Sequence, residues 1–386
     1  MSMQEKPQDI EAWLNALGAP NADRDYKPGH ARIQKLIQRL VFKGFEFSKP
    51  KFRVRIAGTN GKGSTANFLA AALQANGLSI GLYTSPHILN FHERIRVNGE
   101  PITDAELLSL MAEVMPLALE VGTSYFETAT VLALLYFSQQ KVDVEILEAG
   151  VGAKLDATTA VAADMALLTP IALDHQDWLG NTRSEIASEK VFVFQGCSIQ
   201  ISAPQVAEVA AILDAASSAI EAPLFEGELG MLGQHQRINA GLAYAGVTAM
   251  AKQLNQIDVH LAKEAMAKLE IEGRLQTHTF KKHTFVLDAA HNEHAVLALL
   301  PALAKMDALD VIFVATREDR NLSDTLDKLK PYASRLVART GGMSDFKHIR
   351  QVLDDEISQY EAGRFLVLGS FITIAETLKW LKKQNI

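Results

Sequence analysis

The residues best suited to chemistry lie in one short loop, residues 58–65, which reads GTNGKGST. Its glycines let backbone N–H groups approach an anion closely, and a helix that starts there adds a partial positive charge. A lysine in such a loop would reach the outer phosphates of a nucleotide, and a hydroxyl would face the anion or its metal. The loop is therefore predicted to bind ATP through Gly58, Thr59, Asn60, Gly61, Lys62, Gly63, Ser64 and Thr65.

The loop departs from the strict Walker spacing, because position 56 is isoleucine and Gly63 separates Lys62 from Ser64. A second interpretation is a strand-to-helix turn whose glycines only permit tight packing. The apolar run FRVRIA before the loop and the helical pattern STANFLAAALQANG after it favour phosphate binding.

Three more polar residues follow apolar runs of strand length. Ser85 follows LSIGLYT, Glu148 follows VDVEIL, and His175 comes after DMALLTPIAL and Asp174. Ligands of open α/β sheets bind at the carboxyl ends of the strands, so these residues are expected to converge on the loop. Ser85 before a proline is equally typical of a turn, and the pair at 174–175 is also typical of a polar loop.

These residues need a scaffold of strands and helices that alternate along the chain. Unbroken apolar runs separated by helical patterns predict an α/β fold with a mostly parallel sheet covered on both faces, and residues 87–98 are interpreted as a polar loop. The pattern restarts near Arg274. We expect a P-loop NTPase-like domain over residues 1–271, with an N-terminal helical segment, and a smaller Rossmann-like α/β domain over residues 275–386.

Bulk composition narrows the class of protein. The chain has 386 residues, a net charge of −7 and one cysteine, Cys197, interpreted as a small buried apolar residue. The charge argues against nucleic acid and membrane surfaces as partners, and a single cysteine excludes a disulfide framework. The N-terminus has no signal-peptide pattern, and no apolar run approaches the roughly 20 residues that span a bilayer. We expect a cytoplasmic monomer.

Ten segments, in order along the chain, resemble the folylpolyglutamate synthase and dihydrofolate synthase family, which is related to the Mur ligases. Besides GTNGKGS, these segments are YTSPHI with ERIRVNGEPI, YFE, ILEAGVGAKLDAT, ALDHQDWLG, SEK, GQHQRINA, GRLQ, LDAAHN and LVLGSF. ALDHQDWLG and GSF look closest to the bifunctional bacterial members.

The resemblance implies a role for each matching position. Ser85 and Glu148 match ligands of the magnesium that bridges the nucleotide phosphates, and His175 matches a ligand of a second magnesium. Lys62, His175 and Lys190 are the implied catalytic set, with Lys190 matching a lysine that the family carbamylates. Lys190 alone would be a solvated helix charge.

Residues outside the glycine loop, in both domains and the linker between them, are implied in nucleotide binding as well. Asn239 and Arg274 match nucleotide contacts, and Asp288 and His291 match residues that complete the ATP site. Taken alone, DAAHN is equally typical of a strand followed by a helix cap.

Several positions depart from the family pattern. GLGGRLDATN is here GVGAKLDATT, so Ala153, Lys154 and Thr159 replace glycine, arginine and asparagine. VFVFQG follows Lys190, and the C-terminal DKD element reads EDR at residues 318–320. The N-terminal DRDYKPGHARI only loosely resembles the family's LGLERV.

The resulting hypothesis is an ATP- and Mg²⁺-dependent ligase that adds L-glutamate to dihydropteroate, reduced folates or both through an acyl phosphate. One alternative is a Mur-type amino-acid ligase that acts on another carboxylate. Another is a non-catalytic relative that binds nucleotide.

Overall fold

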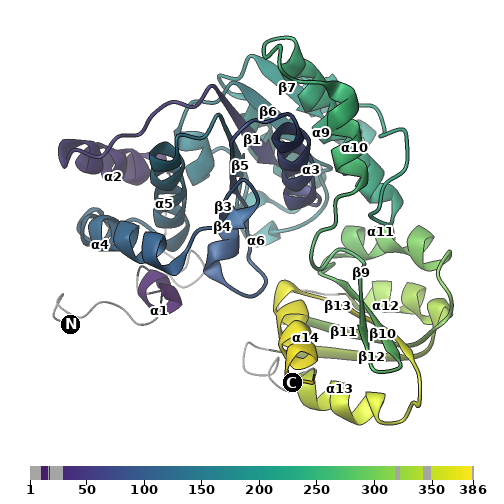
Figure 1. Ribbon diagram of the computed structural model, residues 1–386. Coiled ribbons are helices and arrows are strands. Elements are labelled where there is room, and N and C mark those ends of the chain that lie inside the picture. The colour runs from purple at the N-terminus through teal and green to yellow at the C-terminus, as the bar shows by residue number, and fades with distance from the viewer. Residues whose placement is uncertain (1–9, 16, 18–28, 318–321, 342–348, 385–386) are drawn as a thin grey trace. The chain divides into compact units, whose positions relative to one another are not determined.

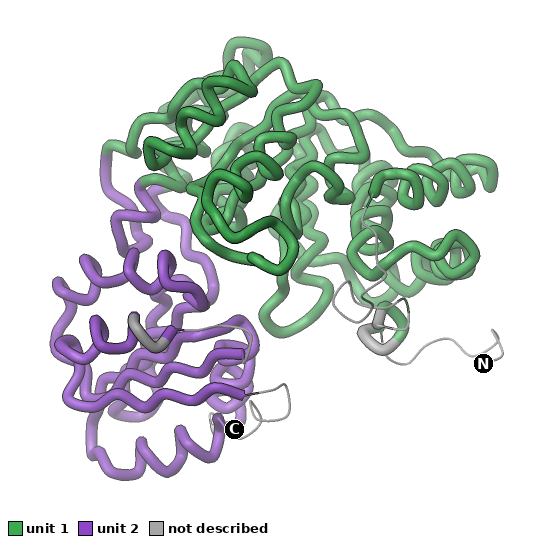
Figure 2. Tube along the Cα trace, turned by 180° about the vertical axis from the view of Figure 1, so that it is seen from behind, with its two compact units in different colours: residues 1–226, 238–266 green, residues 227–237, 267–386 purple. Residues whose placement is uncertain are grey.

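The computed structural model describes residues 10–15, 17, 29–317, 322–341 and 349–384. The chain divides into two compact units (Figure 2), one with residues 1–226 and 238–266 and one with residues 227–237 and 267–386. The first unit holds a large, mostly parallel sheet and the second a smaller sheet, which confirms the predicted α/β class. The expected domain limits, 1–271 and 275–386, stay a prediction.

The described strands of the first unit form one sheet of eight. Its spatial order is β4 (Glu100–Pro101), β3 (Ile95–Val97), β2 (Ile80–Tyr83), β5 (Val144–Glu148), β1 (Phe52–Ala57), β6 (Met165–Leu168), β7 (Ile199–Ser202) and β8 (Ile220–Glu221). From β2 to β8 neighbouring strands pair in parallel, with Ile56 opposite both Glu148 and Leu167. The carboxyl ends of β2, β5, β1 and β6 therefore share one edge.

Helices cover this sheet and supply its cores. They are α1 (Ile10–Asn15), α2 (His30–Phe42), α3 (Lys62–Ala75), α4 (Asp104–Val121), α5 (Tyr125–Gln140), α6 (Gln176–Leu179), α7 (Arg183–Lys190), α8 (Ala207–Ala216), α9 (Gln234–Ala251) and α10 (Val259–Ala267), with α9 and α10 crossing the unit limits. None of the described helices is both long and apolar enough to cross a membrane.

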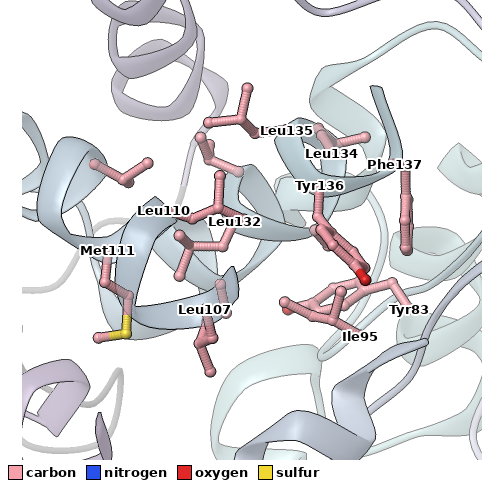
Figure 3. Packing of buried hydrophobic residues seen from close by; sticks show 14 of the residues in the cluster. Tyr83, Ile95, Leu107, Leu110, Met111, Leu132, Leu134, Leu135, Tyr136 and Phe137 are labelled. Atoms are coloured by element: carbon pink, nitrogen blue, oxygen red, sulfur yellow. The ribbon is translucent and has the colours of Figure 1, made fainter. Parts of the chain in front are cut away.

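One apolar cluster joins α2, α4 and α5, which lie side by side in Figure 1, to β2 and β3. Figure 3 shows part of it, with Leu110 of α4, Leu132 and Tyr136 of α5 and Tyr83 of β2 in one cluster. Each large apolar side chain buried in this way stabilises the fold by about 1.5–3 kcal/mol. Capping boxes at Thr103 and Ser124 fix where α4 and α5 begin. The helices are thereby held in one register against the sheet.

The stretch at residues 87–98 corrects the expectation of a polar loop. It contains a short 3-10 helix, η1 (Phe91–Arg94), and then strand β3, which pairs antiparallel with β2. The alternation of apolar and polar residues in β3 lasts only three residues, too short to be recognised without its partner strand.

The second unit is a five-stranded sheet within the described residues. Its order is β12 (Ala333–Gly341), β11 (Leu309–Arg317), β13 (Arg364–Leu368), β10 (His283–Asp288) and β9 (Gln276–Phe280), of which only β9 runs antiparallel to its neighbour. Its helices are α11 (Glu293–Leu303), α12 (Ser323–Leu329), α13 (Ile349–Ile357) and α14 (Phe371–Gln384). Strands β10 to β13 lie after Arg274, where the alternating pattern was predicted to restart.

Candidate functional site

The glycine loop connects β1 to α3 at the shared carboxyl edge of the sheet. Gly58 has φ 139° and Gly61 has φ 90°, both in the region that disfavours other residues. A Cβ on Gly58 would lie 1.9 Å from Thr169 Oγ1, and one on Gly61 would lie 2.1 Å from Asn239 Oδ1. The backbone is therefore packed closely between β6 and α9, and these two glycines cannot be replaced without movement.

The loop leaves polar groups for an anion. No side chain caps α3 at Gly61, so the first turn of this helix receives no hydrogen bond from an N-cap side chain. Thr65 Oγ1 is buried and has no hydrogen-bond partner within the described residues. An unpartnered buried hydroxyl in the first turn of a helix fits a bound phosphate or its metal.

Two ammonium groups lie on the loop. Lys62 Nζ donates to the carbonyl oxygens of Gly58, at 3.3 Å, and Thr59, at 3.1 Å. Lys190 Nζ, from the end of α7, donates to the same Gly58 oxygen at 2.8 Å. The structure thus brings together two of the three residues predicted as catalytic.

Lys190 is not the solvated helix charge that its sequence neighbourhood alone suggested. Its side chain is 2% exposed. Burial, followed by the charge of Lys62, lowers the pKa of Lys190 to about 7, although Asp174 and Asp156 oppose this shift. Near neutral pH a large fraction of this amine is uncharged and therefore nucleophilic.

Glu148 and Ser85 are linked across two neighbouring strands. Glu148 ends β5 with its side chain 3% exposed, and its Oε2 accepts the backbone N–H of Ser85 at 2.9 Å. A Cβ on Gly63 would lie 3.4 Å from the same Oε2, which places the glycine loop against this carboxylate. The predicted phosphate loop and the predicted magnesium ligands therefore lie at one edge.

The side chains at this edge suit a magnesium ion that is held partly by substrate phosphates. They do not suit a metal ion that is held by protein side chains alone. Within the described residues, no group of three or more His, Cys, Asp or Glu side chains could hold a metal ion. Mg²⁺ is usually bound by one or two carboxylates together with substrate phosphates and waters. One buried carboxylate, Glu148, with the hydroxyl of Ser85 beside a phosphate loop meets this requirement.

His175 lies in the loop that follows β6, seven residues beyond the end of that strand. Its φ is 51°, and its N–H donates to Asp174 Oδ1 at 2.8 Å. Asp174 is buried, and its charge acts on Lys190. Asp174, next to His175, is thus connected electrostatically to the lysine at the glycine loop.

The predicted residues of the second unit, Arg274, Asp288 and His291, also come together. Asp288 Oδ2 accepts the N–H of Leu275 at 2.9 Å, which fixes the backbone next to Arg274. The Arg274 guanidinium carbon lies 5.1 Å from the ring centroid of Phe371, and the His291 ring lies 6.1 Å from the same ring. Asn292 caps α11, so DAAHN does form a strand end and helix cap.

Known proteins similar to this chain identify its family. Residues 56–207 match the Mur ligase middle domain. The chain is 30% identical over 368 residues to the dihydrofolate synthase/folylpolyglutamate synthase of Escherichia coli (strain K12), covering 85% of this chain and 86% of that protein. It is 32% identical over 375 residues to the Bacillus subtilis (strain 168) protein of the same name, covering 84% and 83%.

The chain belongs to the dihydrofolate synthase/folylpolyglutamate synthase family. The structure of E. coli FolC in complex with DHPP and ADP superposes with a TM-score of 0.81 at 24% identity, covering 100% of both chains, and supports the fold. The resemblance drawn from the ten motifs is confirmed.

Asp156 is a buried carboxylate that was not among the predicted site residues. Asp156, in the motif LDAT, accepts N–H groups from Gly150, Val151 and Thr158 and the hydroxyl of Thr158. Burial raises the pKa of Asp156. Its place in a quoted motif was the signal that could have found it.

The weakly matching N-terminal stretch also contributes contacts. His30 Nε2 lies 3.0 Å from Thr159 Oγ1, so two positions that differ from the family pattern touch one another. Arg32 forms a two-pronged pair with Glu127 of YFE, at 3.1 and 3.0 Å. Helix α2 is thereby attached to the loop after β5 and to the start of α5. Residues 23–28 of that stretch lie outside the described residues.

Two other departures in this family member contact each other. Lys154 Nζ lies 4.9 Å from the Phe192 ring centroid and 3.9 Å from Glu189. Around Phe192, the residues Val191, Val193 and Phe194 are buried in the core beneath α7. VFVFQG therefore supplies core packing next to Lys190. The EDR element at residues 318–320 lies outside the described residues.

Proposed function

We propose that this chain is an ATP-dependent ligase that joins L-glutamate to dihydropteroate, to reduced folates or to both. The observation that carries the proposal is the gathering of Lys62, Lys190, Glu148 and Ser85 around one glycine loop in a member of this family. The relatives' names supply the substrate class. ATP, L-glutamate and a pterin acid are the proposed substrates, and Mg²⁺ the proposed cofactor.

Activation is the chemical problem, because a carboxylate oxygen is a poor leaving group. A carboxylate oxygen of the acceptor attacks the γ-phosphorus of ATP, ADP leaves, and an acyl phosphate results. The amine of glutamate then attacks the acyl carbon and loses a proton, and phosphate leaves as the amide forms. Positioning and electrostatic stabilisation account for most catalysis of such phosphoryl transfers.

The chain's own residues supply these two effects. Lys62 stabilises the transferring phosphoryl group, and Ser85 and Glu148 hold the magnesium that neutralises phosphate charge when bound. His175 and Lys190 support a second ion, with Lys190 in its carbamylated form. A carbamate turns an ammonium into an anionic oxygen ligand, which suits a hard cation. In the first unit the loop 58–65 and Asn239 bind the nucleotide. In the second unit Arg274, Asp288 and His291 are assigned as nucleotide contacts from their match to the family motifs.

Product analysis tests the function directly. The purified chain is incubated with ATP, Mg²⁺ and L-glutamate, and with dihydropteroate or tetrahydrofolate in separate reactions. Mass spectrometry is expected to find a product heavier by one glutamyl residue in at least one of them. If neither product forms but ATP binds, the chain is a nucleotide-binding relative; a product only from a cell-wall carboxylate would establish the Mur-type alternative.

Lys62→Ala is the matched variant. We expect at least a hundredfold loss of turnover with an unchanged unfolding temperature, because Lys62 acts on the phosphates and is only partly buried. Lys141→Ala, at the exposed C-terminal end of α5, is the control. Glutamate-dependent ADP release that survives in Lys62→Ala would contradict the assigned role.

We also propose that the enzyme works as a cytoplasmic monomer without nucleic acid or membrane partners. ATP and glutamate are cytoplasmic metabolites, and the net charge of −7 disfavours polyanions. Light scattering of the purified chain with and without ATP measures its mass. A dimer in either condition would contradict the monomer.

A further inference from the structure

Side chains from three of the quoted motifs, none of them assigned to the nucleotide site, meet in one cluster of the first unit. Arg94 of ERIRVNG donates its Nε–H to His87 Nδ1 of YTSPHI at 2.9 Å. Its guanidinium carbon lies 5.4 Å from the ring centroid of Tyr125 of YFE and 5.9 Å from that of Phe91. The two rings pack edge to face, 6.1 Å apart. One imidazole and two aromatic rings therefore hold the guanidinium in place.

The backbone around Arg94 is fixed as well. The carboxylate of Glu93 accepts the N–H groups of residues 88–90 at 2.7–2.8 Å and so closes the loop on itself. The carbonyl oxygen of Arg94 accepts the N–H of Thr84 at 3.0 Å. Because Thr84 directly precedes Ser85, this hydrogen bond connects the backbone of Arg94 to the segment that carries a proposed magnesium ligand.

The positive charge of Arg94 is not neutralised by the chain around it. Glu93 is engaged with backbone N–H groups, and no carboxylate of the described residues forms an ion pair with this guanidinium. Its two terminal nitrogens have no hydrogen-bond partner among the described residues, and neither is buried from solvent. An arginine that is half-buried, oriented and unpaired presents a ready fork for a carboxylate.

We propose that Arg94 binds the carboxylate of the acceptor acid, beside the proposed magnesium ligands. This inference rests on the proposed function. The acceptor carboxylate must approach the γ-phosphate, and therefore the edge formed by Ser85 and Glu148, before it can be activated. The backbone of Arg94 is hydrogen-bonded to Thr84, the residue before Ser85, and the guanidinium fork of Arg94 matches the two oxygens of a carboxylate. The amino acid substrate also carries carboxylates, so the experiment separates the two sources.

The test compares Arg94→Gln, Arg94→Lys and the wild type in steady-state kinetics, with dihydropteroate, glutamate and ATP varied one at a time. We expect Arg94→Gln to raise the KM for dihydropteroate at least tenfold, with the KM for ATP changed less than twofold. Arg94→Lys keeps the charge but loses the planar fork. Its KM for dihydropteroate is expected to lie between those of the wild type and Arg94→Gln. Arg39→Gln, on the exposed side of α2, is the matched control with unchanged constants. Circular dichroism melting confirms that each variant folds.

An unchanged KM for dihydropteroate, or a rise confined to the KM for glutamate, would overturn the assignment to the acceptor. If the wild type shows no turnover, titration calorimetry with dihydropteroate and ADP decides. Weaker binding by Arg94→Gln then supports the inference although the ligase function fails, and equal binding overturns it. A wild type that binds no dihydropteroate removes both proposals.

Discussion

Lys62 and Lys190 donate to the same acceptor, the carbonyl oxygen of Gly58, although 128 residues separate them in the chain. One ammonium comes from the start of α3 and the other from the end of α7. When both amines are protonated, they concentrate positive charge at the loop predicted to bind phosphates. Their mutual repulsion contributes to the lowered pKa of Lys190, after the larger effect of burial.

The lowered pKa predicts a chemical modification of Lys190. Only the neutral amine reacts with CO₂, and a pKa of about 7 makes that form abundant at pH 8. Protein equilibrated with ¹³C-bicarbonate at pH 8 is expected to show one carbamate signal by ¹³C NMR, which weakens when the pH is lowered to 6. The signal is expected to disappear in Lys190→Met and to persist in Lys154→Met, because Lys154 is exposed. A spectrum of Lys190→Met that equals the wild type would contradict the assignment.

Lys190 also predicts how stability varies with pH. The folded protein releases the Lys190 proton near pH 7, whereas the unfolded chain holds it until about pH 10.4. Between these values the unfolded state binds more protons, so the Lys190 contribution makes the free energy of unfolding rise with pH. In CO₂-free buffer, chemical denaturation from pH 7 to 9.5 is expected to show a smaller rise for Lys190→Met than for the wild type. Equal slopes would mean that the buried amine titrates normally.

The glycine loop predicts an unequal response to alanine. Gly58→Ala combines a positive φ with a collision at 1.9 Å against Thr169, so we expect a loss of about 3 kcal/mol in the free energy of unfolding. Gly77→Ala has a positive φ but nothing within 4 Å, and is expected to cost about 1 kcal/mol. Urea denaturation of both variants measures the difference. Equal losses would show that contact with Thr169 does not constrain the loop.

Much of the fold could be predicted because its signals are local. VDVEIL and STANFLAAALQANG each carry their own pattern, and they form β5 and α3 as expected. Strands β3 and β9 were missed because short antiparallel strands depend on their partners rather than on a pattern of their own. Strand β6 ends at Leu168, whereas the apolar run in the sequence continues to Leu173. The last part of that run, residues 169–173, is a loop.

The sequence could predict which residues lie at the candidate site, but not which of their side chains contact one another. The strand ends indicated that Glu148 and Ser85 would share an edge with the glycine loop. No pattern indicated that Lys190 is buried against Gly58, because burial of a charge depends on tertiary packing. The pairing of Arg32 with Glu127 likewise joins residues 95 positions apart.

Glu148 predicts how nucleotide binding depends on magnesium. Glu148→Gln keeps the size of the side chain and its acceptor for the Ser85 N–H but removes the negative charge. We expect ATP binding without Mg²⁺ to change less than threefold, while the gain in ATP affinity on adding Mg²⁺ falls at least tenfold. Isothermal titration calorimetry with ATP, in EDTA and in Mg²⁺, measures both quantities. A full magnesium effect in Glu148→Gln would exclude this carboxylate as a ligand.

The pair of Arg32 and Glu127 predicts that the N-terminal helix stabilises the first unit. The Glu127 side chain is 3% exposed and also caps α5, whereas Arg32 is 29% exposed. Removing the guanidinium in Arg32→Met leaves a buried carboxylate short of a partner, so we expect a loss of about 2 kcal/mol in the free energy of unfolding.

A double-mutant cycle with Arg32→Met and Glu127→Gln isolates the interaction between the two side chains, and we expect a coupling of about 1–2 kcal/mol. The matched cycle on the exposed pair of Arg183 and Glu208, with Arg183→Met and Glu208→Gln, is expected to give less than about 0.5 kcal/mol. Burial is the main difference between the two pairs, since each joins an arginine to a glutamate. Equal couplings would show that burial of Glu127 does not strengthen its contact with α2, and that the N-terminal helix is held by its apolar face alone.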